Sequence, residues 1–205
     1  MDLKLKMLLD LENKKKIKIK DGELYYDRFF FNNIEANKYF NLLKKEIQWR
    51  QDNIKIFGKI YPQPRLTALY ANNNKSYSYS NIKMHPITFT PTLFDIKSKI
   101  EKRLNSQFTS CLLNLYRNGQ DSNGWHADNE KELGLNPVIA SLSLGAERVF
   151  HMKHRNDKKE KLKINLTNGS LLVMRGKTQH HWLHQIPKTR KKVEERINLT
   201  FRIIK

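Results

Sequence analysis

Seven short apolar or alternating segments in the C-terminal half constrain the fold more than any other feature of the chain. Gly, Asn or Pro residues separate them, and runs of this length between turn residues are typical of β-strands. Their sequences are FTSCLLNLY, VIASLSLG, RVFHMKH, KLKINL, GSLLVMRG, HHWLHQI and RINLTFRII. So many short strands in one half of a chain predict a β-sandwich or a jelly-roll barrel.

Two stretches of helical spacing accompany the strands, at residues 35–49 and 91–104. We expect both to be amphipathic helices packed on the outside of the strands, which gives an α+β fold class. The Asp21-Gly22 pair predicts a hairpin near the N-terminus. Residues 54–60 alternate apolar and polar side chains before a proline-rich turn, so they predict a strand or a second hairpin.

The composition is strongly basic. The chain has 205 residues with 39 Lys and Arg against 20 Asp and Glu, a formal net charge of +19. Such an excess attracts polyanions, so nucleic acid is the first candidate partner and an anionic membrane the second. Lysine chosen merely as a solubilising residue is the alternative. One cysteine, no secretory signal and no apolar run of membrane-spanning length predict an intracellular protein that no membrane holds.

The segment WHADNE places His126 and Asp128 two residues apart. If both lie in one strand, their side chains share a face and can bind one metal ion. A third ligand would come from His85, His151, His154, His180, His181 or His184, and the segment HHWLHQI holds three of these. On a strand, His180 and His184 would share one face. Two histidines and a carboxylate suit non-haem Fe(II), although zinc accepts the same ligand types.

The segment RINLTFR alternates without a fault. Arg196, Asn198, Thr200 and Arg202 would face one side of a strand, and Ile197, Leu199 and Phe201 the other. Two inward-facing arginines predict a dicarboxylate ligand, because guanidinium binds carboxylate through paired hydrogen bonds. An edge strand with arginines reaching solvent is the alternative. Asn114 and Tyr116 would add two polar side chains to one face of another strand.

Three motifs together, NLYRNGQDSNGWHADNE, ASLSLGAERVF and GSLLVM…HHWLHQIPK…RINLTFR, resemble the AlkB family. Its members are Fe(II)- and 2-oxoglutarate-dependent dealkylases of nucleic acids, and the likeness is strongest to the animal DNA and RNA repair homologues. It covers residues 54–205. The resemblance implies a jelly-roll core with iron ligands His126, Asp128 and His184. It also implies a 2-oxoglutarate site formed by Arg196, Arg202, Asn114, Tyr116 and Asn198.

The same resemblance implies contacts to a damaged base. The residues concerned are Glu130, the lid residues Tyr77, Tyr79 and Ser80, the hairpin residue Phe57, and the nearby Arg65. Trp125 we expect to pack beneath the iron strand. The predicted division is residues 1–50 as an N-terminal extension with a helix, 51–90 as a nucleotide-recognition lid and hairpin, and 91–205 as the dioxygenase core.

The reaction implied is oxidative demethylation of 1-methyladenine and 3-methylcytosine in DNA, or in RNA, with O2 as co-substrate and 2-oxoglutarate converted to succinate. Extruding a base is easiest where its pairing is already disrupted. We expect a monomer, cytoplasmic in a prokaryote and nuclear in a eukaryote. Two alternatives stay open at this point. One is a 2-oxoglutarate-dependent hydroxylase of a protein or small molecule, and the other is an inactive nucleic-acid-binding protein.

Overall fold

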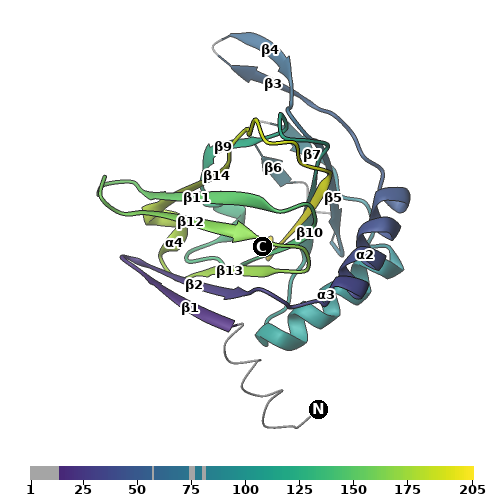
Figure 1. Cartoon of the computed structure of the whole chain (residues 1–205), viewed down its shortest axis with the longest axis horizontal. Coiled ribbons are helices and arrows are strands. Elements are labelled where there is room, and N and C mark those ends of the chain that lie inside the picture. The colour runs from purple at the N-terminus through teal and green to yellow at the C-terminus, as the bar shows by residue number, and fades with distance from the viewer. Residues whose placement is uncertain (1–13, 57, 74–76, 80–81) are drawn as a thin grey trace.

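Two antiparallel sheets stacked face to face form the body of the protein in a computed structural model (Figure 1). The structure describes residues 14–56, 58–73, 77–79 and 82–205. The larger sheet has seven strands in the order β1-β2-β13-β10-β15-β8-β5, and the smaller has four in the order β12-β11-β14-β9. Two two-stranded hairpins, β3-β4 and β6-β7, complete the strand set.

Strands of the large sheet come from both ends of the chain. Their bounds are β1 Lys14–Ile19, β2 Gly22–Asp27, β5 Leu66–Ala71, β8 Ser110–Tyr116, β10 Ile139–Gly145, β13 Leu171–Arg175 and β15 Arg196–Arg202. The predicted hairpin at Asp21-Gly22 is confirmed, and β2 pairs with β13 at the edge of the core sheet. The N-terminal hairpin is therefore part of the main sheet.

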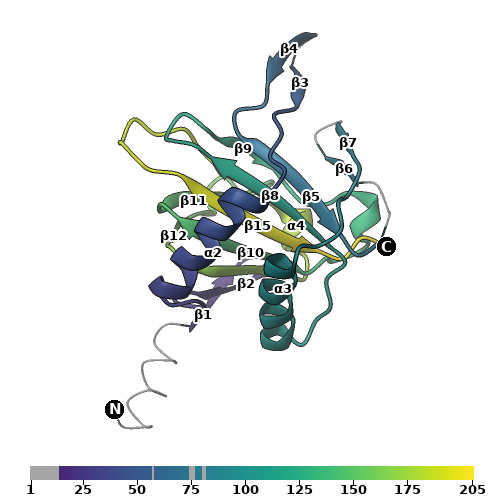
Figure 2. The same cartoon turned by 90° about the vertical axis from the view of Figure 1, so that its right-hand side faces the viewer.

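The small sheet consists of β9 Asn123–His126, β11 Arg148–His154, β12 Lys161–Leu166 and β14 Trp182–Ile186. The hairpins consist of β3 Asn53–Ile56 with β4 Lys59–Pro62, and β6 Tyr77–Tyr79 with β7 Ile82–Met84. Both project from one end of the body (Figure 2). Residues 54–60 thus form a hairpin, one of the two structures that their alternation predicts.

Two helices, α2 Asn33–Glu46 and α3 Pro91–Leu104, cover the outer face of the large sheet (Figure 2). The predicted bounds of α3 are confirmed, since Thr90 caps its first turn through Leu93 and Asn105 ends it in a left-handed conformation. The other helix begins at Asn33, because the Oδ1 of Asn32 accepts the Glu35 N–H. It ends at Glu46, three residues earlier than expected, because Ile47 turns into extended backbone.

Two apolar clusters result from this layering. One lies between the helices and the large sheet and includes Leu43, Ile96, Ile197, Leu199 and Phe201. The other lies between the two sheets and includes Leu112, Phe150, Met152 and Trp182. In the described part of the chain, no helix has the length and apolar composition that a membrane crossing needs. Short elements η1 Lys131–Leu133 and α4 Thr178–His181 connect strands near the open end of the sandwich.

Candidate metal centre and its pocket

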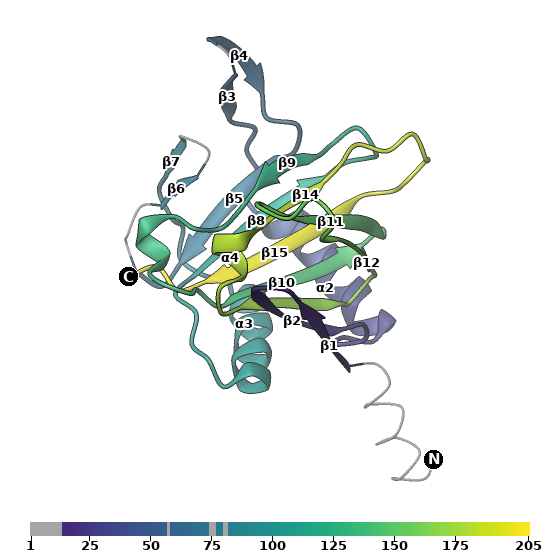
Figure 3. The same cartoon turned by 90° about the vertical axis from the view of Figure 1, so that its left-hand side faces the viewer.

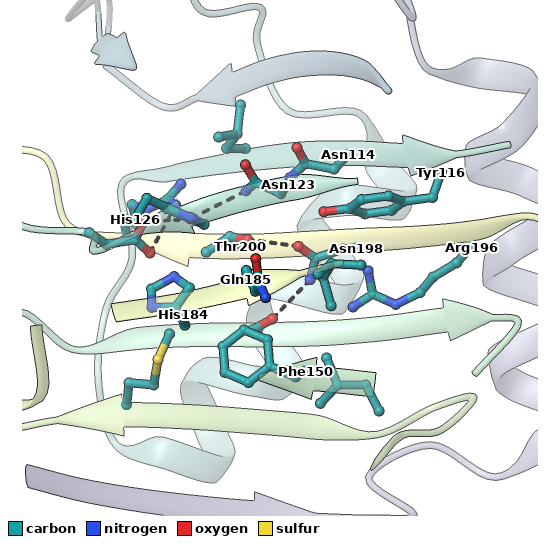
Figure 4. Close-up of a pocket in the computed structure, with 17 residues that line it drawn as sticks. Asn114, Tyr116, Asn123, His126, Phe150, His184, Gln185, Arg196, Asn198 and Thr200 are labelled. Atoms are coloured by element: carbon teal, nitrogen blue, oxygen red, sulfur yellow. Dashed lines mark hydrogen bonds and ion pairs between the residues drawn. The ribbon is translucent and has the colours of Figure 1, made fainter. Parts of the chain in front are cut away.

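Two histidines face each other across neighbouring strands of the small sheet. His126 of β9 and His184 of β14 are directly opposed in the antiparallel register. Their ring centroids lie 4.2 Å apart, in an edge-to-face arrangement (Figure 4). His184 is buried at 4% exposure, and His126 is partly exposed towards the opening. The third ligand predicted with His126 is therefore brought to it by strand pairing.

Asp128 lies close to the two histidines, but strand periodicity is not what positions it. β9 ends at His126, so Asp128 lies beyond the strand and not on its face. Its backbone N–H donates to the Oε1 of Gln179 in α4 at 2.9 Å, and its Oδ2 lies 3.0 Å from Nη2 of Arg202. The expectation that strand periodicity aligns His126 with Asp128 is wrong. A side-chain anchor from α4 and a buried ion pair place the carboxylate instead.

The three side chains fit a divalent metal ion. One ligand atom from each lies within 4.8 Å of the others, and the His126 Nε2 is 3.9 Å from Asp128 Oδ1. His126 Nδ1 lies 2.8 Å from the Gly124 carbonyl, which keeps the proton on Nδ1 and makes Nε2 the acceptor of the ring. Asn123 Nδ2 lies 3.3 Å from Nε2, and a metal ion would replace this contact. Asp128 Oδ1 and His184 Nδ1 are buried without a hydrogen-bond partner among the described residues.

The charge states of these ligands suit metal binding. Burial lowers the pKa of His126, and burial together with the neighbouring His126 lowers the pKa of His184 to about 3. Burial alone would raise the pKa of Asp128, but Arg202 and the two histidines hold it below its ordinary value. Both rings are therefore neutral and the carboxylate is ionised at neutral pH, which are the forms that bind a metal.

The pocket beside this centre lies between the two sheets. Its floor is the face of β15 that carries Arg196, Asn198, Thr200 and Arg202, as Figure 4 shows for the first three. Arg196 is opposite Tyr116 and Asn198 is opposite Asn114 in the register with β8. Ile197, Leu199 and Phe201 face the helix-side core. The arginines of β15 therefore point inwards, and the alternative of a solvent-facing edge strand is excluded.

This combination of an interior histidine–aspartate–histidine group and inward arginines can be compared with known proteins. A family model described as the 2OG-Fe(II) oxygenase superfamily matches residues 23–202. The chain belongs to this superfamily.

Curated relatives narrow the membership to the AlkB homologues. The human alpha-ketoglutarate-dependent dioxygenase alkB homolog 3 is 41% identical over 179 residues, which cover 83% of this chain and 62% of the relative. The human DNA oxidative demethylase ALKBH2 is 33% identical over 184 residues, covering 85% and 70%. Its Arabidopsis thaliana counterpart is 36% identical over 211 residues, covering 89% and 67%. The chain thus spans 62% of the length of its alkB homolog 3 relative from human.

A solved structure shows the same architecture. "The structure of OsALKBH1" superimposes with a TM-score of 0.64 at 17% identity, covering 92% of this chain and 100% of that chain. At that identity the likeness concerns the fold alone. The jelly-roll core predicted from the strand count is confirmed by the sheet topology, the superfamily match and this neighbour.

Arg196 has the chemistry expected of a 2-oxoglutarate-superfamily arginine. It is 1% exposed, and its Nη2 donates to Ser143 Oγ at 2.9 Å. Its Nε and Nη1 have no hydrogen-bond partner in the described part of the chain. Burial lowers the pKa of Arg196 to about 10, which still leaves the guanidinium charged at neutral pH. A buried cation with two unused donors fits a carboxylate.

The second arginine has a different partner. Arg202 lies at the other end of β15, where its guanidinium pairs with the candidate metal ligand Asp128. The sequence presents Arg196 and Arg202 as equivalent, but the structure places them at opposite ends of the pocket floor. Arg202 is thus in contact with the carboxylate of Asp128, whereas Arg196 lies beside Tyr116, 5.2 Å from its ring centroid.

The residues predicted to contact a base are only partly described. Phe57 and Ser80 lie outside the described residues, and the structure gives Tyr77 and Tyr79 as backbone of β6. Arg65 is buried at 3% exposure, where its Nε donates to Asn114 Oδ1 at 2.7 Å. Arg65 therefore supports a predicted cosubstrate residue. Glu130 lies two residues after Asp128 and caps η1.

The other histidines of HHWLHQI do not share a strand with His184. His180 and His181 belong to α4, so the predicted strand begins two residues late, at Trp182. Thr178 closes this helical turn by donating to the Arg175 carbonyl and accepting the Glu23 N–H at 2.9 Å. His154 and His181 lie near Asp21 at 4.8 Å or less. His154 Nδ1 accepts the Asp157 N–H at 3.1 Å, which leaves its Nε2 protonated towards Asp21 and disfavours a metal.

Two supporting residues have no signal in the sequence. Gln179, fully buried, holds Asp128 as described above. Arg148 is also buried and donates to the carbonyls of Asp121 at 2.9 Å and Pro187 at 2.6 Å. Arg148 thereby ties the loop before β9 to the loop after β14. Since both residues act through backbone groups of distant segments, local spacing could not reveal them.

Proposed function

We propose that this chain is an Fe(II)- and 2-oxoglutarate-dependent dioxygenase that demethylates N-alkylated bases, with 1-methyladenine and 3-methylcytosine in DNA as its substrates and RNA as a second polymer. One observation carries the proposal most directly. The histidine–aspartate–histidine group and the two unused donors of Arg196 line one pocket. Relatives that bear the names of an alkB homolog and a DNA oxidative demethylase support the substrate class.

The residues of the chain would divide the work of the reaction. His126, Asp128 and His184 hold the metal, and Arg202 balances the buried charge of Asp128. Arg196 binds the far carboxylate of 2-oxoglutarate, with Asn114, Tyr116 and Asn198 along the same floor. When bound, Fe(II) would combine O2 as the oxidant with 2-oxoglutarate as the co-reductant, which becomes succinate and CO2; this chemistry would hydroxylate the N-alkyl carbon, and a methyl group would leave as formaldehyde.

Water must be kept from this pocket during oxidation. Phe150, Leu112, Leu166 and Met174 form the apolar part of its wall. These side chains belong to the cluster packed between the two sheets, so the wall is rigid and dry on that side. This wall would exclude water from that side of the pocket.

The base would enter from the open end. A base must leave its stack to reach the metal, and lesions that disrupt pairing lower the cost of that step. Glu130 is assigned to the exocyclic amine, and Tyr77, Tyr79 and Ser80 to the lid over the base. Phe57 would occupy the space that the base leaves in a duplex, while Arg65 acts from below through Asn114. The protein would act as a monomer.

The experiment is incubation with Fe(II), 2-oxoglutarate and oligonucleotides that carry one 1-methyladenine or 3-methylcytosine, followed by mass analysis of the DNA. We expect demethylation by the wild type and by His180→Ala, a matched variant because His180 lies in α4 outside the metal group. His184→Ala should give none. If His184→Ala still removes methyl groups from the oligonucleotides, the assignment of His184 as a metal ligand is wrong. No demethylation of any oligonucleotide by the wild type contradicts the function.

A further inference from the structure

The small sheet has an outer face that turns away from the pocket. Along β11 and β12, buried residues alternate with half-exposed or exposed ones. The outward positions hold Trp125, His151, Lys153, Lys161, Lys163 and Leu183. Lys153 pairs with Lys161 and His151 with Lys163 in the register, so the three lysines lie on two adjacent strands. We call these six residues the outer basic face.

Trp125 lies on this face and does not pack beneath the iron strand, so the expectation for it was wrong. It is 40% exposed, and the Lys153 Nζ lies 4.4 Å from its ring centroid. A large aromatic ring left half in solvent beside a lysine is the arrangement that single-stranded nucleic acid uses for stacking. Sequence periodicity could not separate the two faces of so short a strand.

β9 is also the edge of the small sheet (Figure 3). Trp125 directly precedes His126, whose ring faces the pocket. The aromatic platform and the metal ligand are therefore on opposite faces of a single edge strand. If a nucleic-acid strand places one base in the pocket, its backbone has to pass around β9 for a neighbouring nucleotide to reach Trp125.

The charge of the outer basic face also favours a nucleic-acid strand as its ligand. A hollow on the outer side is lined by Lys153, His154, Arg155, Lys158, Lys161 and Leu183. The hairpin that frames it also holds two acids, Asp157 and Glu160. Lys20 neutralises Asp157 at 2.8 Å, so the face keeps a net positive charge. Positive side chains beside an aromatic ring fit phosphates and a stacked base.

We propose that the outer basic face binds the single strand that carries the target base, with a neighbouring base stacked on Trp125 and its phosphates along Lys153, Lys161 and Lys163. The proposal rests on the proposed function, since it concerns the same substrate. It makes Trp125 a nucleic-acid contact that the pocket does not include.

The test compares long and short substrates. Metal-loaded protein with 2-oxoglutarate, kept without O2, is titrated with a single-stranded 15-mer and with a trinucleotide, each bearing one 3-methylcytosine. Trp125→Ala should weaken binding of the 15-mer roughly 5- to 100-fold, the effect of removing one stacking ring. Trinucleotide binding and metal affinity should stay unchanged, and Trp125→Phe should recover part of the loss.

A matched control exists on α3. Phe94 is 59% exposed and has the Lys97 Nζ 5.7 Å from its ring centroid, but it lies on the helix-covered side of the molecule. Phe94→Ala should bind both oligonucleotides as the wild type does. The double variant Lys161→Ala, Lys163→Ala should lower the magnitude of the slope of log affinity against log salt by about 1.4, about 0.7 for each lysine on a single strand.

Two outcomes overturn the proposal. Equal affinity of Trp125→Ala and wild type for the 15-mer removes the stacking contact. If Trp125→Ala weakens binding of the 15-mer and of the trinucleotide equally, the substitution acts at the pocket, and the stacking contact is again excluded. Failure of the proposed function is distinguishable, because it appears as absent demethylation by the wild type whatever the binding of the Trp125 variants.

Discussion

Asp128 is the candidate metal ligand that lies outside regular secondary structure. It lies past the end of β9, so no strand hydrogen bond fixes its backbone. Gln179 provides the missing acceptor at 2.9 Å, and Arg202 holds the carboxylate at 3.0 Å. Partners of metal ligands orient those ligands and contribute to affinity. Gln179 is therefore a positioning residue.

Gln179→Leu should weaken binding of Mn(II) or Co(II) by about 10- to 100-fold, the usual effect of losing such a partner. The reason is that the Asp128 N–H loses its acceptor and the loop is free to move. Met174→Leu is the control, since it removes the 3.3 Å contact between the Gln179 amide nitrogen and Met174 Sδ but keeps the Gln179 Oε1 that accepts the Asp128 N–H. Anaerobic metal titration measures both. Equal affinity in wild type and Gln179→Leu contradicts the role.

Arg196→Lys tests the cosubstrate end of the pocket. Lysine keeps the charge but loses the planar pair of donors that a carboxylate accepts. The Kd for 2-oxoglutarate should rise by about 30-fold or more, as when one partner of a buried charged pair is altered. Arg117→Lys, at the partly exposed ion pair with Asp121, is the control. Isothermal titration under anaerobic conditions measures the Kd, and an unchanged Kd for Arg196→Lys sinks the assignment.

The strands β8 and β15 each carry polar pocket residues on one face and apolar core residues on the other. On β8, Asn114 and Tyr116 line the pocket, whereas Cys111 and Leu113 belong to the helix-side core. Each face is packed, so a slip of one residue in register would bury the arginines in the apolar core. The alternation thus fixes both the core and the site.

The buried face of β8 gives a prediction about pH. Burial raises the pKa of the Cys111 thiol well above its ordinary value, so the thiol keeps its proton in alkaline solution. Since only the thiolate reacts, iodoacetamide should not label the folded protein between pH 7 and pH 9. Labelling in denaturant at the same pH is the control, monitored by mass. Fast labelling of the native protein at pH 8 contradicts the burial.

An element could be predicted when the signal for it lies in its own residues, and not when it depends on contacts with distant residues. Most strands of the C-terminal half and α3 carry local periodicity or caps, so the residues themselves predict them, whereas β5 Leu66–Ala71 is not among the predicted strands. α4 was read as strand because its turn depends on Thr178 contacting β2, over 150 residues away in the chain. The metal ligands could be named from the AlkB resemblance, but the anchoring of Asp128 could not, because it depends on α4.

In the molecule as a whole, the two sheets position the candidate site and the net charge favours a polyanion. The sandwich holds the metal group and Arg196 at the floor of one pocket, while the formal charge of +19 attracts a polyanion to the surface. Composition alone could indicate the partner but not the face it uses. Only the order of the strands shows that Lys153 reaches Trp125 on the edge strand that carries His126, whereas Lys161 and Lys163 lie on the opposite edge strand, β12.

If the histidine–aspartate–histidine group and Arg196 serve one reaction, oxidation of 2-oxoglutarate and demethylation of the base must be coupled. Succinate, formaldehyde and the demethylated base are measured together, in one sample, with a single-stranded 3-methylcytosine oligonucleotide. The account predicts that the wild type forms all three in equal amounts, and that Asp128→Ala forms none while it still binds the oligonucleotide. Demethylation without succinate, or undiminished demethylation by Asp128→Ala, would contradict it.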